Sequence, residues 1–315
     1  MKICVIGAGR WGRNHIRTLN EIGVLECIVD SNKNQLNKLK KKYSDIKLFD
    51  SIKMALDLDL DGFVISTPPN THVPIAKKII KTGKPILIEK PLALSLKEAQ
   101  DLNQYAEKLN SKILVGHLLL FHPAIQKMKS MVNDGLIGKI QYIYSNRLNL
   151  GVVRENEDVF WSFAPHDISL FQYFTNSFPK NIKSIGGSFL KKNINDTTIT
   201  HFTYPNNIQG HIYVSWLHPF KEHRLVIIGS KGTLAFEDSS EGSPLIHYIK
   251  DDTFNLNSVL KNKSVNKIKY KYSLPLLNEL NYFIEVINGL PISKCSIKEG
   301  IDVIKILEMS IESQE

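Results

Sequence analysis

The sequence predicts two α/β domains, the first built on a doubly wound parallel sheet and the second on a mostly antiparallel sheet. The chain has 315 residues, about twice the length of a usual single domain. Over roughly the first 115 residues, short β-branched runs alternate with longer amphipathic stretches. From Ile140 onward, shorter runs of alternating character dominate. We place the boundary so that residues 1–118 form the first domain and residues 119–315 the second, with the last helices able to pack back on the first.

In the first domain each strand is followed by a helix, which is typical of a parallel sheet covered on both faces. We expect strands at residues 2–6, 26–29, 62–66, 85–88 and 112–116. We expect helices at residues 12–21, 33–43, 52–57, 71–82 and 95–109. Ser95, with Glu98 three residues later, forms a capping box that marks the start of the last of these helices.

In the second domain, turn residues such as Pro205-Asn206-Asn207 separate strands of alternating character, which favours antiparallel pairing. We expect strands at residues 140–146, 183–189, 197–204, 208–216, 224–229 and 233–237. We expect helices at residues 123–134, 165–174, 276–288 and 297–311. The stretch 251–269, rich in Asn and Lys, is the best candidate for an irregular or mobile excursion.

The composition excludes several classes of protein. No apolar run reaches the roughly 18 residues of a membrane span, and the first apolar run is too short for a signal peptide, so we expect a soluble, cytoplasmic protein. Three scattered cysteines predict reduced core thiols and no metal site. The net charge of +9 is compatible with nucleic-acid binding, but the lysines do not cluster. The positive electrostatic field of the protein would also attract a small anionic substrate.

The first predicted strand runs into Gly7-Ala8-Gly9-Arg10-Trp11-Gly12 and then a helix, which predicts a dinucleotide site. In this motif Gly7 permits a tight turn, Gly9 lets the backbone approach phosphate oxygens, and Gly12 lets helix and strand pack closely. Arg10 and Trp11 lie in the same loop. Asp30 ends the second strand, where a carboxylate accepts the ribose hydroxyls and repels a 2′-phosphate, so NAD is favoured over NADP.

Two more motifs follow later strands of the parallel sheet, at the edge where such sheets bind ligands. The first motif supplies the candidate cofactor contacts Ser66, Thr67, Pro68, Asn70 and His72. The second is Glu89-Lys90-Pro91, in which Lys90 is placed to hydrogen-bond a reacting oxygen and stabilise a developing alkoxide. The alternative for Lys90 is a surface ion pair in a turn.

These motifs resemble the Gfo/Idh/MocA family of oxidoreductases over nearly the whole chain. The resemblance rests on residues 7–12, 66–72 and 89–91 and on a closing pattern at residues 275–279 and 287–291. It implies a Rossmann domain followed by an α/β domain with a large open sheet, which in relatives often forms dimer and tetramer contacts. A homodimer or homotetramer is therefore expected.

In the family, a helix of the second domain presents an Asp and, four residues later, a His that acts as acid or base. Here His166 matches the His, while Ser162 stands where the Asp is expected. The resemblance thus shifts proton transfer to His166 and Lys90. The alternative for His166, next to Pro165, is a capping or packing role at a helix start. A second departure is Leu120, where many relatives carry Arg.

The stretches 145–151, 161–169 and 215–224 resemble a subgroup that acts on nucleotide-linked amino sugars. That subgroup oxidises the C3 hydroxyl of UDP-N-acetylglucosamine or its uronate, and a partner aminotransferase then makes a 3-amino sugar for lipid A or surface polysaccharide. The candidate substrate contacts are Lys90, His117, Arg147, Asn149, Ser162, His166 and Arg224, with Lys221 as a further cation. Trp161 is expected to line the nicotinamide pocket or to fill a domain interface. For the cations, the alternative is ordinary surface charge.

We therefore expect an NAD-dependent dehydrogenase whose substrate is a UDP-linked N-acetylhexosamine. Two alternatives remain open at this point: a dehydrogenase of a free polyol or simple sugar such as inositol or glucose, and a non-catalytic, cofactor-binding regulator. Whether the sugar carries a C6 hydroxyl or carboxylate is also open.

Overall fold

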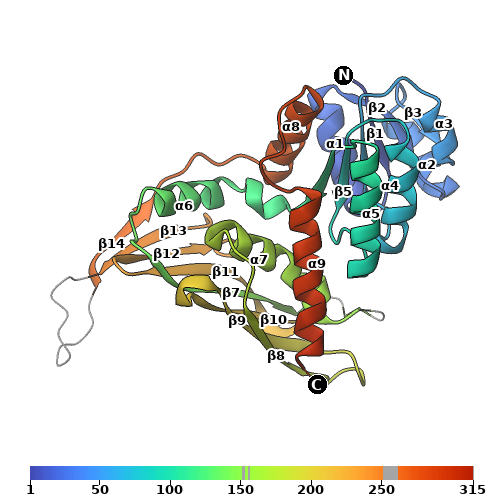
Figure 1. Ribbon diagram of the computed structural model, residues 1–315. Coiled ribbons are helices and arrows are strands. Elements are labelled where there is room, and N and C mark those ends of the chain that lie inside the picture. Colours follow the sequence, from blue (N-terminus) through green and yellow to red (C-terminus); the bar gives the residue numbers. More distant parts are fainter. Residues whose placement is uncertain (151–152, 155–156, 251–261, 315) are drawn as a thin grey trace. The chain divides into compact units, whose positions relative to one another are not determined.

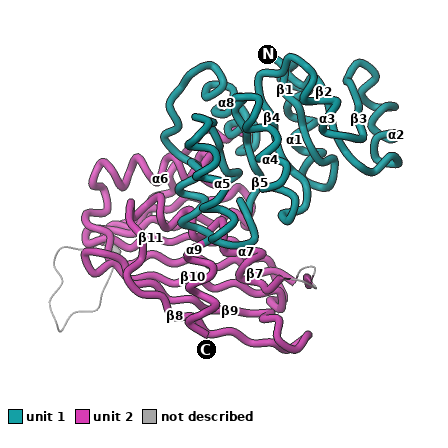
Figure 2. The backbone as a smooth tube through the Cα atoms, turned by 45° about the vertical axis from the view of Figure 1, so that its right-hand side comes forward, with its two compact units in different colours: residues 1–118, 274–304 teal, residues 119–273, 305–315 magenta. Residues whose placement is uncertain are grey.

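The computed structural model describes residues 1–150, 153–154, 157–250 and 262–314, and its chain divides into two compact units. Figure 2 colours them separately. Unit 1 contains residues 1–118 and 274–304, and unit 2 contains residues 119–273 and 305–315. The stretch 274–304 therefore belongs with the first unit, and the last helix, α9 (Ile297–Glu312), contributes to both.

Unit 1 contains a six-stranded sheet of the order β3-β2-β1-β4-β5-β6, in which every neighbouring pair is parallel. Its strands are β1 (Ile3–Ile6), β2 (Leu25–Val29), β3 (Lys47–Phe49), β4 (Gly62–Ile65), β5 (Ile86–Glu89) and β6 (Ile113–Gly116). This order confirms the predicted doubly wound sheet. The edge strand β3 was not predicted, because three residues are too few to show a period.

Helices cover the sheet of unit 1, as Figure 1 shows. They are α1 (Gly12–Ile22), α2 (Lys33–Lys42), α3 (Ile52–Leu56), α4 (His72–Ile80), α5 (Leu96–Lys108) and α8 (Pro275–Ile287). Helix α1 packs against α8, and α4 against α5. Every residue of β1, β4 and β6 is buried, which requires that both faces of the sheet are covered. The predicted cap holds, since Ser95 Oγ accepts a hydrogen bond from the Glu98 backbone N–H.

Unit 2 contains an eight-stranded sheet of the order β14-β13-β12-β11-β7-β10-β9-β8. The strands are β7 (Ile140–Leu150), β8 (Asn181–Gly187), β9 (Thr197–Thr203), β10 (Gln209–Ser215), β11 (Leu217–Gly229), β12 (Gly232–Glu237), β13 (Leu245–Lys250) and β14 (Asn262–Ile268). Only β7 and β10 pair in parallel, so the sheet is mostly antiparallel, as predicted. Helices α6 (Pro123–Asn133) and α7 (Val159–Thr175) pack on it (Figure 1).

Four features of unit 2 differ from the expectations. Residues 262–268, expected to be irregular, form β14 along the edge of the sheet, and residues 251–261 lie outside the described part of the chain. Strand β11 begins seven residues earlier than expected, and β13 was not expected. Helix α7 begins at Val159 rather than at residue 165, because Asp158 caps it and Pro165 lies inside it.

Candidate active site

The glycine loop after β1 has the geometry that a dinucleotide needs. Gly7 adopts a φ of +95°, and a Cβ there would lie 2.7 Å from the Ser66 backbone oxygen. A Cβ on Gly12 would lie 1.9 Å from the Gly7 oxygen, so this glycine is required for the close packing of α1 on the loop. A Cβ on Gly9 would meet no atom within 4 Å. The loop is thus open at Gly9, where a phosphate would approach, while Arg10 and Trp11 are exposed beside it.

Asp30 follows β2 and lies against the same loop. Its Oδ2 accepts a hydrogen bond from the Ala8 backbone N–H at 2.6 Å, and its Oδ1 accepts one from the Asn32 N–H at 2.7 Å. The carboxylate therefore links the glycine loop to the start of α2. Each carboxylate oxygen retains a second acceptor position, which suits the ribose hydroxyls of NAD.

The segment after β4 is held to the glycine loop and to the segment after β5. Ser66 Oγ donates to the Gly7 carbonyl oxygen at 2.9 Å. His72 is 1% exposed; its Nδ1 lies 2.9 Å from the Pro91 oxygen and its Nε2 lies 2.9 Å from the Thr67 oxygen. His72 thus supports the cofactor edge from inside, and the predicted direct contact between His72 and the cofactor does not fit this burial. Pro68 and Asn70 are exposed.

Glu89 fixes the backbone that carries Lys90. Its Oε1 accepts a hydrogen bond from His15 Nε2 at 2.7 Å, and its Oε2 accepts the Lys90 backbone N–H at 3.2 Å. Burial raises the pKa of Glu89, but His15 and Lys90 outweigh this effect and bring it below its usual value, so the side chain is a carboxylate. The Lys90–Pro91 peptide bond is cis.

His117 follows β6, and its side chain is 2% exposed. Burial and the nearby Lys90 lower the pKa of His117 to about 4, with Glu89 opposing them, so the ring is neutral near pH 7. The ring lies within the electrostatic reach of Lys90. Its burial leaves little of the ring accessible to the substrate that the sequence predicted it to contact.

In unit 2, His166 lies in the middle of α7. Asp158 caps the helix by accepting the Trp161 backbone N–H at 2.9 Å, and Trp161 is half-buried. Ser162 is 8% exposed. His166 is half-buried, and its carbonyl oxygen accepts a hydrogen bond from Ser169 Oγ. Because His166 is a full turn or more from the helix start, the alternative role as a capping residue is wrong.

The neighbour of His166, Asp167, was not recognised in the sequence as a functional residue. Arg147 in β7 donates from Nε to Asp167 Oδ2 at 2.7 Å and from Nη2 to Oδ1 at 3.0 Å. The Arg147 side chain is 11% exposed and that of Asp167 is 2% exposed. Two of the guanidinium nitrogens are therefore committed to a buried carboxylate, so Arg147 anchors α7 to the sheet rather than serving as the phosphate ligand that the sequence predicted.

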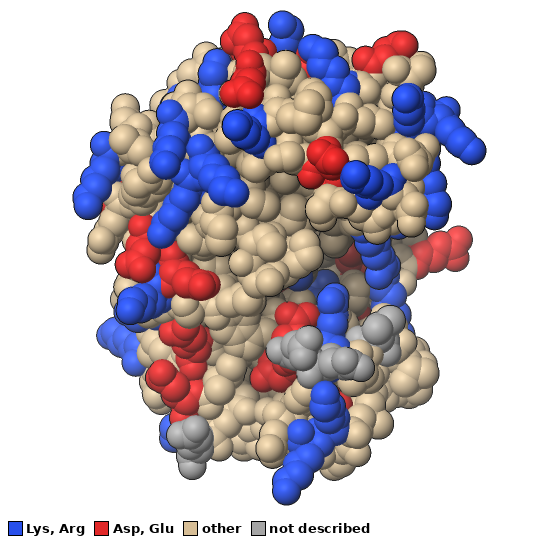
Figure 3. Space-filling view, turned by 90° about the vertical axis from the view of Figure 1, so that its right-hand side faces the viewer, with Lys and Arg blue, Asp and Glu red and all other residues tan. Residues whose placement is uncertain are grey.

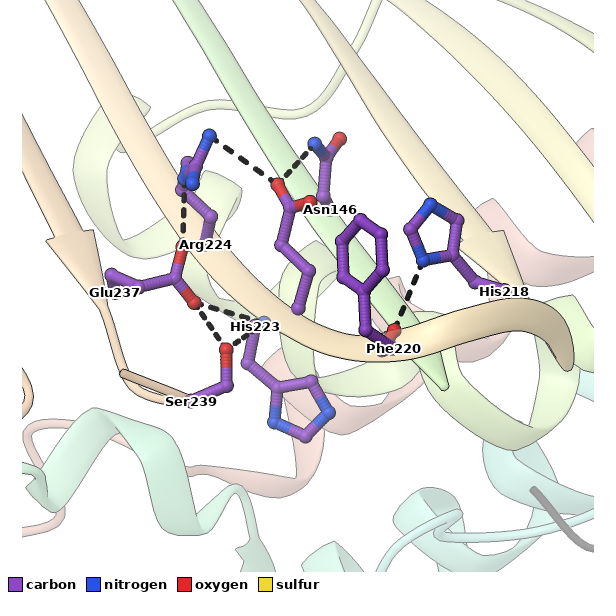
Figure 4. Close-up of polar contacts among 8 residues, drawn as sticks. Asn146, His218, Phe220, His223, Arg224, Glu237 and Ser239 are labelled. Atoms are coloured by element: carbon purple, nitrogen blue, oxygen red, sulfur yellow. Dashed lines mark hydrogen bonds and ion pairs between the residues drawn. The ribbon is translucent and has the colours of Figure 1, made fainter. Parts of the chain in front are cut away.

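Arg224 is the second predicted phosphate ligand that has acidic partners, as Figure 4 shows. Its Nε donates to Glu237 Oε2 at 2.7 Å, and its Nη1 lies 3.5 Å from Glu222 Oε1. Asn146 Nδ2 also donates to Glu222 at 2.8 Å. The Arg224 side chain is 44% exposed, however, so it remains accessible. Asn149, near the end of β7, is half-buried.

A small cavity of about 20 Å³ adjoins the Arg147–Asp167 pair, and His223 and Asp238 also line it. This volume suits about one water molecule. Burial, Arg147 and Lys221 lower the pKa of His223 to about 3, so its ring is neutral. His223 lies in the stretch 215–224 that carries the subgroup resemblance, but neither it nor Asp238 was recognised from the sequence as a site residue.

On the face drawn in Figure 3, Lys and Arg side chains are interspersed with Asp and Glu side chains. Among the described residues, no three His, Cys, Asp or Glu side chains are grouped as metal ligands. The three cysteines are buried and unpaired, as predicted. In the described part of the chain, no helix has the length and apolar character needed to cross a membrane.

Unit 1 thus has the features of an NAD site: an open glycine loop at the start of α1, Asp30 beside it, and Lys90 held by Glu89 at the carboxyl end of β5. Helix N-termini offer free N–H groups to a pyrophosphate, and a Lys at such an edge supplies positive charge to a developing alkoxide. In unit 2, His166 in α7 is of a residue type that can act as an acid or a base near neutral pH.

Comparison with known proteins agrees with this reading. Residues 1–117 match the oxidoreductase family with an NAD-binding Rossmann fold, GFO/IDH/MocA, and residues 125–235 match the C-terminal domain of the same family. UDP-N-acetylglucosamine 3-dehydrogenase of Acidithiobacillus ferrooxidans is 29% identical over 187 residues, which span 59% of this chain and 58% of that protein. The scyllo-inositol 2-dehydrogenase (NAD(+)) of Bacillus subtilis is 22% identical over 99% of this chain and 92% of its own length.

Solved structures share the fold over the whole chain. The structure of UDP-N-acetylglucosamine 3-dehydrogenase GnnA from A. ferrooxidans superposes with a TM-score of 0.88 at 22% identity, covering 99% of this chain and 97% of that one. The WlbA dehydrogenase from Bordetella pertussis, solved with NADH and UDP-GlcNAcA, has a TM-score of 0.80 at 17% identity and covers 99% and 96%. The chain is an NAD-dependent oxidoreductase that belongs to the Gfo/Idh/MocA family.

Proposed function

We propose that the chain oxidises the C3 hydroxyl of a UDP-linked N-acetylhexosamine, UDP-N-acetylglucosamine or its uronate, to the 3-keto sugar. The observation that carries the proposal is the likeness to UDP-N-acetylglucosamine 3-dehydrogenase, in sequence over more than half of the chain and in fold over nearly all of it. The WlbA structure, solved with a UDP-sugar uronate, supports the same substrate class.

In this proposal Lys90 and His166 act on the same hydroxyl. Lys90 donates a hydrogen bond to the C3 oxygen and stabilises the negative charge that develops there, and His166 takes the hydroxyl proton. The residues of the glycine loop and Asp30 would hold NAD, which would supply the hydride acceptor for C3. The candidate cofactor contacts in unit 1 are Gly7, Gly9, Arg10, Trp11, Gly12, Asp30, Ser66, Thr67, Pro68, Asn70, Glu89 and Lys90, and Trp161 of unit 2 is a further candidate.

The chain's own residues also place the sugar. Arg147 positions α7 through Asp167, so the remaining candidates for direct contact with the sugar and diphosphate are Asn149, Ser162, Arg224 and Lys221. His117, buried against Lys90, contributes as a neutral ring that adds no charge to the site. The ketone product suits an aminotransferase partner in the formation of a 3-amino sugar, and a homodimer or homotetramer is the assembly we propose.

The test is NADH formation with UDP-N-acetylglucosamine and with its uronate, each in the presence of NAD, an aminotransferase and glutamate to remove the ketone. Lys90→Ala should depress turnover by roughly 100-fold or more, far more than it weakens NADH binding, since removal of one donor at a developing oxyanion has effects of that size. Near-normal turnover in Lys90→Ala would contradict the assigned role. Thermal protection by UDP would support a nucleotide site.

A second candidate is oxidation of a free polyol. It is favoured by the full-length likeness to scyllo-inositol 2-dehydrogenase. Such an enzyme has no uridine site, so it would show NADH formation with inositol and no thermal protection by UDP.

A further inference from the structure

Several buried polar side chains of unit 1 gather around Glu89. Glu279 in α8 is 1% exposed, His15 in α1 is fully buried, and His117 is 2% exposed. Within the described residues, no hydrogen-bond partner is present for either carboxylate oxygen of Glu279, for His15 Nδ1 or for either ring nitrogen of His117. Buried polar atoms are normally paired, so this many in one place indicates internal water or a functional arrangement.

Glu89 and Glu279 are close enough to influence each other's charge, and they differ sharply in their surroundings. Glu89 has the His15 ring, the Lys90 backbone N–H and the Lys90 ammonium to stabilise its negative form. Glu279 has no such partner among the described residues. Burial, and then the charge of Glu89, raise the pKa of Glu279 well above its usual value. Of the two carboxyl groups, Glu89 is therefore the anion and Glu279 holds the proton.

The other ionisable groups nearby do not offset this difference. The Cys295 thiol, just before α9, is buried, and burial together with Glu279 and Glu299 raises its pKa, so it is neutral. Glu299 is engaged by the Ser296 N–H at 2.7 Å. Lys294 lies on the same segment but its own pKa is lowered by burial. Of the two carboxyl groups, Glu89 is the one whose negative form is stabilised by Lys90.

Gly116 leaves room for this arrangement. It pairs with Glu89 across β5 and β6, and a Cβ at residue 116 would lie 3.3 Å from Glu89 Oε2. The carboxylate of Glu89 therefore lies over a position where only a glycine leaves full room. Helix α8 is held close by the contact of Phe283 and Ile287 with Gly62 in β4, which brings Glu279 to the same region of unit 1.

We propose that Glu279 is a positioning residue for Lys90, acting as a neutral carboxylic acid that donates a hydrogen bond through buried water to the carboxylate of Glu89. A neutral Glu279 keeps one negative charge beside the lysine. An ionised Glu279 would add a second negative charge, which would disfavour formation of the alkoxide that Lys90 stabilises. The role toward Lys90 rests on the proposed function, whereas the protonation of Glu279 does not.

Infrared spectroscopy tests the protonation directly, without substrate. The difference spectrum between the full-length protein and Glu279→Gln at neutral pH should contain the C=O stretch of one protonated carboxylic acid. Glu285→Gln, an exposed position on the same helix, should show no such band and serves as the matched control. Absence of the band in the Glu279→Gln difference spectrum would overturn the proposal, whichever substrate the enzyme uses.

The pH profile of kcat tests the positioning role. Glu279→Gln cannot ionise, so it should keep turnover within about threefold and extend the alkaline limb to higher pH than in the parent protein. Glu279→Leu, which has no donor, should lose about tenfold or more in kcat while the Kd for NADH is unchanged. Identical pH profiles in the parent and Glu279→Gln, or equal losses in Gln and Leu, would show that the side chain only fills space. The substrate for this assay is whichever of UDP-N-acetylglucosamine, its uronate or inositol is turned over.

Discussion

Removal of Asp167 should destabilise unit 2 far more than the breaking of an exposed ion pair of the same length. The carboxylate is 2% exposed and takes two hydrogen bonds from Arg147, which is 11% exposed. Asp167→Ala leaves an uncompensated guanidinium in that environment, and the cost of breaking such a buried pair is about 3–5 kcal/mol. For a unit of this size, each kcal/mol lowers Tm by about 2–4 °C, so we expect a fall of about 6–20 °C.

The matched control is Arg224→Ala in the same unit. Arg224 and Glu237 are also 2.7 Å apart, but the Arg224 side chain is 44% exposed. Pairs of this kind contribute about 0.2–1 kcal/mol, so this variant should lose only a few degrees. Thermal unfolding followed by circular dichroism gives both values under one set of conditions.

A double variant isolates the pair from the packing. Arg147→Met with Asp167→Leu removes both charges together and should recover much of the stability lost in Asp167→Ala. If Asp167→Ala costs no more than Arg224→Ala, or if the double variant is as unstable as the single one, the pair does not hold α7 to the sheet as described.

Three further predictions concern unit 1. Gly9→Ala should leave Tm unchanged, since no atom lies within 4 Å of the new Cβ, but it should weaken NADH binding by about tenfold or more. Gly12→Ala should lower both Tm and NADH affinity, because its Cβ would overlap Gly7. Equal effects of the two variants on Tm and on NADH affinity would contradict these separate roles. His117 has a folded pKa of about 4 and an ordinary value of 6.5, so the unfolded chain binds its proton first and the protein should lose about 2 kcal/mol as pH falls from about 7 to about 5. In urea unfolding, the free energy of unfolding of His117→Gln should fall by about 2 kcal/mol less than that of the parent protein over this pH range. An equal fall in both proteins would refute the prediction. Asp30→Asn should raise KM for NAD and weaken discrimination against NADP, as measured by initial rates with each cofactor; unchanged selectivity would argue against a ribose contact.

The sequence predicts unit 1 well because its signals are local. Parallel strands that are buried on both faces read as continuous apolar runs, and Gly7 and Gly12 are required by close approaches within one loop. Strand β14 could not be predicted, because its signal is not local. Its Asn and Lys residues resemble a disordered stretch, yet charged residues suit an exposed edge strand, and only pairing with β13 reveals it.

The site in unit 2 depends on contacts that no local pattern shows. A proline is common at the start of a helix, but Pro165 lies inside α7, because Asp158 caps the helix seven residues earlier. Arg147 and Asp167 are twenty residues apart on different elements, so their pairing emerges only in the fold. Glu279 did have a signal: in α8 it shares the helical face of Phe283 and Val286, which places a carboxyl on a buried stripe.

NADH formation with UDP-N-acetylglucosamine and with its C6 uronate, in the presence of NAD, a trapping aminotransferase and glutamate, is the most direct test of the proposed substrate class. We predict NADH with one or both of these sugars, and the preferred one identifies the C6 group. No NADH from either sugar, together with turnover of scyllo-inositol or glucose, would contradict the nucleotide-sugar assignment.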